Sequence, residues 1–188
     1  MKKINISKEL WSTAIKRYIK KEEFNVADSI NQTPHSMNMV DDKIILRIEN
    51  DQLLHWLGGA VGSCIPIINI FNERIYCIIT DSYIKDVPYE YFREFVEYHE
   101  QGHIVLGHLE NMESMTKFQL FLLKIQNLLG IGGGIKQECL ADEYAAKLIG
   151  YDEVIKCLSL MNKTFKITSI QFLQFRARIK YLKKRVVE

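Results

Sequence analysis

Apolar residues in the first half of the chain fall in short runs rich in β-branched side chains, and three of these runs predict strands. The first covers residues 43–48 (KIILRI), and the other two cover residues 65–70 and 74–80. Only three residues separate the last two runs, so we expect them to pair as an antiparallel hairpin with a short turn. Residues 24–40 are irregular and polar, and their pattern predicts no regular element.

Elsewhere, apolar residues recur every three or four positions, which predicts helices. A helix with start signals at Asp86 and Pro88 should end at Gly107. The expected buried face of this helix is Phe92, Phe95, Val96, His99, His103 and Leu106. The other predicted helices cover residues 7–21, 52–57, 115–129, 135–149, 152–161 and 169–185.

A small sheet followed by a mainly helical second half predicts an α+β fold, in which a small antiparallel sheet packs on a helical bundle. The length of 188 residues suits one domain with its own core. We therefore expect a single domain over residues 1–188. Within it, residues 65–185 would form the core, and residues 1–60 an N-terminal extension.

Composition removes several classes of protein. The 25 Lys and Arg nearly balance the 23 Asp and Glu, so no nucleic-acid partner is expected. Four scattered cysteines without a CxxC pair, and no secretory segment, favour the cytoplasm. Polar residues interrupt the most apolar stretch, residues 118–135, so no spanning helix is predicted. Contact with a membrane surface, through residues 118–129 and the basic C-terminus, is a lesser alternative.

The run HEQGH at residues 99–103 is the clearest sign of chemistry. Side chains four residues apart on a helix project from one face, so His99 and His103 can bind one Zn²⁺ at about 2.0–2.1 Å. Glu100 is offset from them by one helical step, where it can contact a metal-bound water. That is the position of the general base in HExxH peptidases.

A catalytic zinc site needs at least one more protein ligand. His108 follows His103 by five residues, which does not fit the metzincin spacing HExxHxxGxxH. Glu138 is the better candidate, because Glu138 and Asp142 stand four residues apart on a predicted helix and share a face. Asp142 is placed to accept a hydrogen bond from the outer ring nitrogen of His99 or His103.

Together, HEQGHIVLGH and ECLADEYAAKLIG resemble the HExxH and ExxAD motifs of HtpX-like and CAAX-prenyl-protease-like zinc metallopeptidases, of the gluzincin type. The resemblance runs from about residue 65 to residues 176–182 (RARIKYL), which are similar to the family's C-terminal RIxxL element. It implies a zincin-like fold, Zn²⁺ as cofactor, and His99, His103 and Glu138 as ligands.

Typical members of that family have membrane-spanning helices, whereas the stretch between the two motifs here is only amphipathic. Membrane location and prenylated substrates are therefore not implied. The string HEQGHIVLGH also resembles ImmA/IrrE-like peptidases of mobile elements. Their third-ligand helix usually reads differently from ECLAD, so the first resemblance is preferred.

A peptidase also needs a cationic or phenolic donor for the carbonyl oxygen in the transition state. The candidates are Arg178, Arg176, Tyr144 and Tyr181, with Arg178 first because it lies in the RIxxL-like element.

The resulting hypothesis is a zinc-dependent endopeptidase that acts on a protein or peptide substrate. The strand at residues 74–80 would align the substrate along a free edge. The alternative is a zinc-binding regulatory or protein-interaction module that cleaves nothing.

Overall fold

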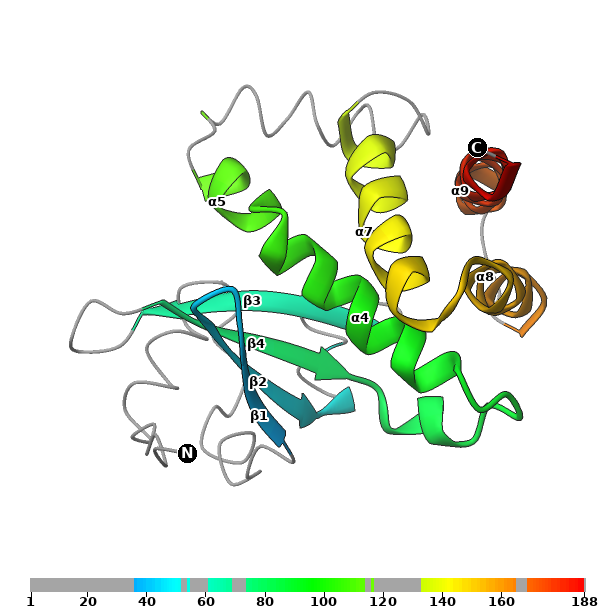
Figure 1. Cartoon of the computed structure of the whole chain (residues 1–188). Coiled ribbons are helices and arrows are strands. Elements are labelled where there is room, and N and C mark those ends of the chain that lie inside the picture. The colour runs from blue at the N-terminus through cyan, green and yellow to red at the C-terminus, as the bar shows by residue number, and fades with distance from the viewer. Residues whose placement is uncertain are drawn as a thin grey trace. The chain divides into compact units, whose positions relative to one another are not determined.

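The structure is a computed structural model of the whole chain (Figure 1). It describes residues 36–51, 54, 61–68, 74–113, 116, 133–164 and 169–187. The chain divides into two compact units, Met1–Asp86 and Val87–Glu188. The first unit carries the sheet and the second carries the long helices, which confirms the α+β class. The organisation as a single domain stays a prediction.

The sheet has four strands: β1 (Ser36–Val40), β2 (Lys43–Glu49), β3 (Gly62–Ile68) and β4 (Arg74–Thr80), in the order β1-β2-β4-β3. The predicted antiparallel pairing of β3 with β4 is confirmed. The expectation of a wholly antiparallel sheet is wrong, because β2 pairs with β4 in parallel. Strand patterns identify the strands but not their neighbours, and β4 inserts between β2 and β3.

Strand β4 is one of the two inner strands of this sheet, and its residues are buried. Residues 75–80 are all buried, as expected for a strand covered on both faces. The predicted free edge along residues 74–80 is therefore wrong, since β4 is hydrogen-bonded on both sides. A substrate cannot add to it as a new strand, and the outer strands of the described sheet are β1 and β3.

Strand β1 corrects the expectation that residues 24–40 hold no regular element. It joins β2 through Asp41 and Asp42, whose φ angles of 47° and 63° both lie in the left-handed region. Two such residues make the tight turn whose twist suits a hairpin, and Asp is among the residues that tolerate it. The five residues of β1 (SMNMV) carry no continuous apolar run, so this short strand was missed.

The second unit contains α4 (Phe92–Val105), α5 (His108–Glu113), α7 (Gly133–Ile149), α8 (Tyr151–Thr164) and α9 (Ser169–Val187). The predictions of helices over residues 135–149, 152–161 and 169–185 are confirmed to within a few residues. Helix α4 begins later than its start signals suggest, because a short 3₁₀ helix, Ser82–Lys85, and turns occupy residues 82–91. It does end before Gly107, whose φ is 70°.

Helix α7 lies at the centre of the second unit and contacts α4, α8 and α9 (Figure 1). Its small residues Ala141 and Ala145 are fully buried. On α4, most of the predicted stripe is buried as expected, but Leu106 is 41% exposed because the helix has already ended there. The core of this unit therefore surrounds the helix pair that carries both sequence motifs.

No helix in the described ranges is both long enough and apolar enough to cross a membrane. The predicted helices over residues 7–21 and 115–129 lie outside the described residues, apart from Thr116. The same holds for the turn at residues 71–73 and for most of residues 52–57.

Candidate metal centre

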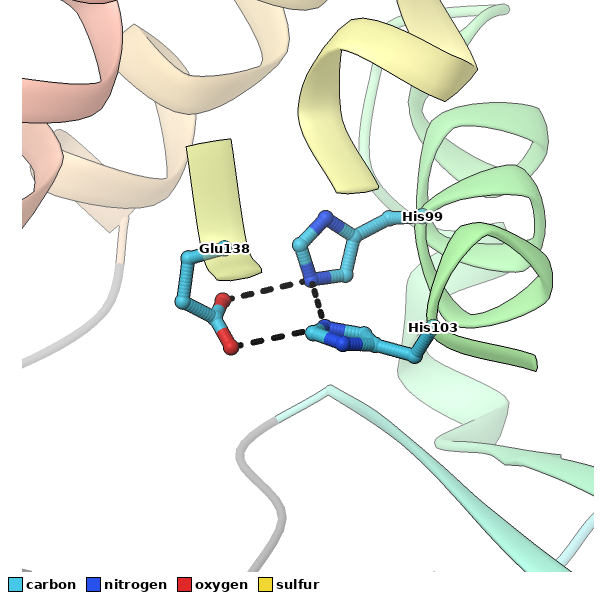
Figure 2. A group of neighbouring side chains, drawn as sticks. All are labelled: His99, His103 and Glu138. Atoms are coloured by element: carbon cyan, nitrogen blue, oxygen red, sulfur yellow. Dashed lines mark hydrogen bonds and ion pairs between the residues drawn. The ribbon is translucent and has the colours of Figure 1, made fainter. Parts of the chain in front are cut away.

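Helix α4 places His99 and His103 one turn apart on the same side (Figure 2). Their Nε2 atoms are 3.2 Å apart, and their ring centroids are 4.8 Å apart. Both side chains are largely shielded, with exposed fractions of 10% for His99 and 13% for His103. Two nitrogen lone pairs therefore converge on one small volume.

Glu138 on α7 faces this pair, with one carboxylate oxygen toward each ring (Figure 2). Its Oε2 lies 3.3 Å from Nε2 of His99, and its Oε1 lies 3.4 Å from Nε2 of His103. Two ligands bound to zinc at 2.0–2.1 Å with a tetrahedral angle are about 3.3–3.4 Å apart. Each Nε2 atom thus lies at such a separation from one oxygen of Glu138, and the three residues can each offer one ligand atom with all three atoms within 4.8 Å of one another, so they could hold a metal ion.

A close approach of the two helices brings these residues within reach. At Gly102 on α4, an added Cβ would lie 3.0 Å from the Cα of Ala141 and 3.1 Å from its carbonyl oxygen. Beside this contact, Gln101 donates a hydrogen bond of 2.7 Å to the hydroxyl of Tyr144. A glycine on one helix and an alanine on the other therefore set the spacing between the histidines and Glu138.

Asp142 fixes the orientation of His99. Its Oδ1 accepts a 2.8 Å hydrogen bond from Nδ1 of His99, and the carboxylate is fully buried. With Nδ1 donating, the Nε2 lone pair of His99 points toward Glu138 and His103. A carboxylate behind a metal-binding histidine holds the ring and raises its basicity.

The site favours positive charge. Burial lowers the pKa of His99, but hydrogen bonds and charges from Asp142 and Glu138 outweigh it and raise the pKa to about 10. A metal cation bound beside His99 would be stabilised by the same two carboxylates, Asp142 and Glu138. Glu138 also keeps 38% of its side chain exposed, so the cluster is reachable from solvent on that side.

Arg178 on α9 binds both carboxylates. Its Nε and one Nη donate to the two oxygens of Asp142 at 2.6 Å each, and the other Nη lies 3.1 Å from Oε2 of Glu138. Burial alone would raise the pKa of both carboxyl groups. The Arg178 charge, with help from the histidines, instead holds both pKa values below their ordinary range. Both groups therefore remain ionised and act as acceptors.

The four candidates for stabilising a carbonyl oxygen have other contacts in this structure. Arg178 is engaged with Asp142 and Glu138, as described. Tyr181 donates to Glu143 at 2.5 Å, and the hydroxyl of Tyr144 accepts from Gln101. Arg176 is exposed, and its guanidinium lies over the ring of Phe172. Of the four, Arg178 contacts the cluster within the described ranges, with Nη atoms 3.1 Å from Oε2 of Glu138 and 3.4 Å from Nδ1 of His99.

His108 has a position that the sequence reasoning missed. It is buried, and its Nδ1 lies 2.9 Å from Nδ1 of His103, on the side of that ring away from Glu138. Burial, with the neighbouring His103, lowers the pKa of His108 to about 4. The signal available in the sequence was the pair Gly107-His108 directly after the helix end, where a left-handed residue can turn the chain back.

Glu100 lies between the two motif histidines on α4 and is partly buried. Glu100 was predicted as the general base. It belongs neither to the cluster of His99, His103 and Glu138 nor to the hydrogen bonds that Asp142 and His108 make with the two histidines. Its place in the helix is the one expected of a general base.

Comparison of the chain with protein-family models, with curated proteins and with solved structures found no match. The residues themselves therefore carry the functional argument.

Proposed function

We propose that this protein is a zinc-dependent peptidase with His99, His103 and Glu138 as the metal ligands. The observation that supports the proposal most directly is the convergence of the two Nε2 atoms, 3.2 Å apart, on the Glu138 carboxylate, whose Oε2 lies 3.3 Å from His99 and whose Oε1 lies 3.4 Å from His103. Two imidazoles and a carboxylate are a common ligand set of catalytic zinc, and they leave one position open. The HExxH and ExxAD motifs support the same assignment.

The surrounding residues suit a bound cation. Asp142 holds His99 from behind, and Arg178 keeps Asp142 and Glu138 ionised. The donors are nitrogen and oxygen, which suit zinc better than calcium or magnesium, ions that take oxygen ligands. A zinc ion bound here would lower the pKa of a water molecule and polarise a peptide carbonyl.

Glu100 has the proton-transfer role in this proposal. Its carboxylate takes a proton from the attacking water and passes it to the leaving amine of the cleaved peptide. A protein or peptide is the proposed substrate, because the HExxH motif is typical of enzymes that cleave peptide bonds.

A second candidate is a zinc-binding module that cleaves nothing. It is favoured by the contacts of Arg178, Tyr144 and Tyr181, each of which is hydrogen-bonded to another side chain of the protein. Zinc binding alone does not separate the two candidates, because both keep the same three ligands.

The test has two stages. Zinc content is measured by mass spectrometry for the wild type, His103→Ala, Glu138→Gln and Glu100→Gln, with Glu94→Gln as control. Glu94 is an exposed carboxylate on the same helix, α4, so its substitution makes the same chemical change away from the site. Zinc near one equivalent in the wild type, Glu100→Gln and Glu94→Gln, and its loss in the two ligand variants, is the expected result.

The second stage compares cell extracts treated with wild type or with Glu100→Gln and searches them for newly formed peptide termini. Termini that appear with the wild type and with Glu94→Gln, but not with Glu100→Gln, support the peptidase. Zinc in the wild type without any such termini supports the module. A wild type that binds no zinc rejects both candidates.

A further inference from the structure

His108 is the first residue of α5 and returns toward α4 through a turn at Gly107. The turn is closed by a 3.2 Å hydrogen bond from the Gly107 amide to the carbonyl of Ile104. The rings of His103 and His108 then meet edge to face, with centroids 5.0 Å apart. His108 is only 6% exposed, so this contact is shielded from water.

The contact joins two ring nitrogens, and this fixes the protons. Nδ1 of His103 and Nδ1 of His108 are 2.9 Å apart, a hydrogen-bond distance that needs one N–H and one lone pair. Nε2 of His103 points toward Glu138 and His99 and must keep its lone pair to bind a metal. The proton of His103 must then be on Nδ1, and the lone pair must belong to His108.

We infer that His108 is a positioning residue: its neutral imidazole accepts a hydrogen bond from Nδ1 of His103 and holds the Nε2 lone pair of His103 toward the metal. The inference rests on the proposed metal centre. The two metal-binding histidines thus have chemically different partners, a carboxylate behind His99 and a neutral ring behind His103. A neutral acceptor adds no further negative charge to a site that already contains Glu138 and Asp142.

Nuclear magnetic resonance of the zinc-loaded full chain, with ¹⁵N-labelled histidine, tests the wild type directly. A proton on Nδ1 of His103, with scalar coupling across an N–H···N bond to Nδ1 of His108, is the expected signature. A proton on Nδ1 of His108 pointing to His103, or no coupling between the two rings, overturns the inference. This measurement needs no substitution, so it does not depend on a variant that folds.

Variants test the consequence for binding. His108→Leu removes the acceptor, whereas the amide oxygen of His108→Asn can take the place of Nδ1. We expect His108→Leu to raise the dissociation constant for zinc by about 10- to 100-fold, the range seen when such outer partners are removed. His108→Asn should recover most of the loss. Tyr144→Phe is the control, because it removes another hydrogen bond to α4, from Gln101, without touching His103.

The outcomes separate this inference from the proposed function. If the wild type binds zinc, and His108→Leu, His108→Asn and Tyr144→Phe all bind it with the wild-type affinity, the role of His108 is rejected and the proposed metal centre stands. Equal losses in the Leu and Asn variants also reject it, because a merely structural role would not be rescued by an acceptor. No zinc in the wild type rejects the metal centre itself, and this inference with it.

Discussion

Gly102 lies against Ala141 so closely that an added Cβ would come within 3.0 Å of the Cα of Ala141. The Cβ of Tyr144 would be only 3.2 Å away. Backbone atoms cannot move aside as a flexible side chain can, so any larger residue at position 102 must push α4 and α7 apart. The same two helices carry His99, His103 and Glu138, so their spacing also determines the separation of the donor atoms.

Gly102→Ala should therefore destabilise the protein, although alanine is the better helix former by about 1 kcal/mol. Overpacking typically costs about 1–3 kcal/mol, which exceeds that gain. Urea denaturation of the metal-free protein and zinc titration should both show a loss. Glu94→Ala, at an exposed position of α4, is the control for helix propensity and should be nearly neutral. Greater stability of Gly102→Ala with unchanged zinc affinity would contradict the close packing.

Arg178 and Asp142 form a buried ion pair with two hydrogen bonds. Arg178→Met keeps most of the side-chain length but leaves the fully buried Asp142 carboxylate without its cation. Breaking one partner of a buried pair typically costs about 3–5 kcal/mol. Chemical denaturation should show a loss of that size, and Arg176→Met, at an exposed position of α9, should change stability little.

The double variant Asp142→Asn with Arg178→Met checks the physical cause. Removing the second charge should restore part of the stability, because no unpaired buried charge then remains. If the double variant loses as much unfolding free energy as Asp142→Asn and Arg178→Met lose together, the two side chains are not coupled as described.

Local features of the fold followed from the sequence because they depend on short stretches. The helices α7, α8 and α9 repeat apolar residues at helical spacing, and Gly150, with a φ of 102°, ends α7 as expected. The order of the strands did not follow, since the insertion of β4 between β2 and β3 depends on contacts far apart in sequence. Strand β1 and helix α5 were missed because each is short and neither carries a continuous apolar run.

The candidate site divides in the same way. The spacing of His99 and His103, and of Glu138 and Asp142, is a property of single helices, so the sequence showed which residues share a face. The ion pairs of Arg178 join α9 to α7 over 36 residues, and no spacing rule reaches that far. The sequence spacing was used to test His108 only as a metal ligand. The turn at Gly107 instead brings His108 to Nδ1 of His103, the ring nitrogen that faces away from Glu138.

Gly107 provides the next prediction. Its φ of 70° lies in the left-handed region, which costs a residue with a Cβ about 1–2 kcal/mol. Gly107→Ala should lower stability by about that amount, and Gly107→Asn should lower it less, because Asn visits this region more readily. Since this turn positions His108, Gly107→Ala should also weaken zinc binding. Equal stabilities of the wild type, Ala and Asn variants in urea would show that the turn is not needed in this form.

The pH dependence of stability can be predicted at Glu143 on α7, which accepts a hydrogen bond from Tyr181 on α9. Burial raises the pKa of Glu143, but hydrogen bonds from Tyr181 and Lys147, with the charges of Lys147 and Arg185, outweigh it and lower the pKa overall. A carboxylate whose pKa is lower in the folded chain contributes stability above its unfolded pKa of about 4.3 and loses it as the pH falls through the folded value.

The difference in unfolding free energy between wild type and Glu143→Gln should therefore be largest at neutral pH and shrink below pH 4. A gap for Glu143→Gln that stays constant or widens in acid would contradict the bonds from Tyr181 and Lys147 as the source of this stability.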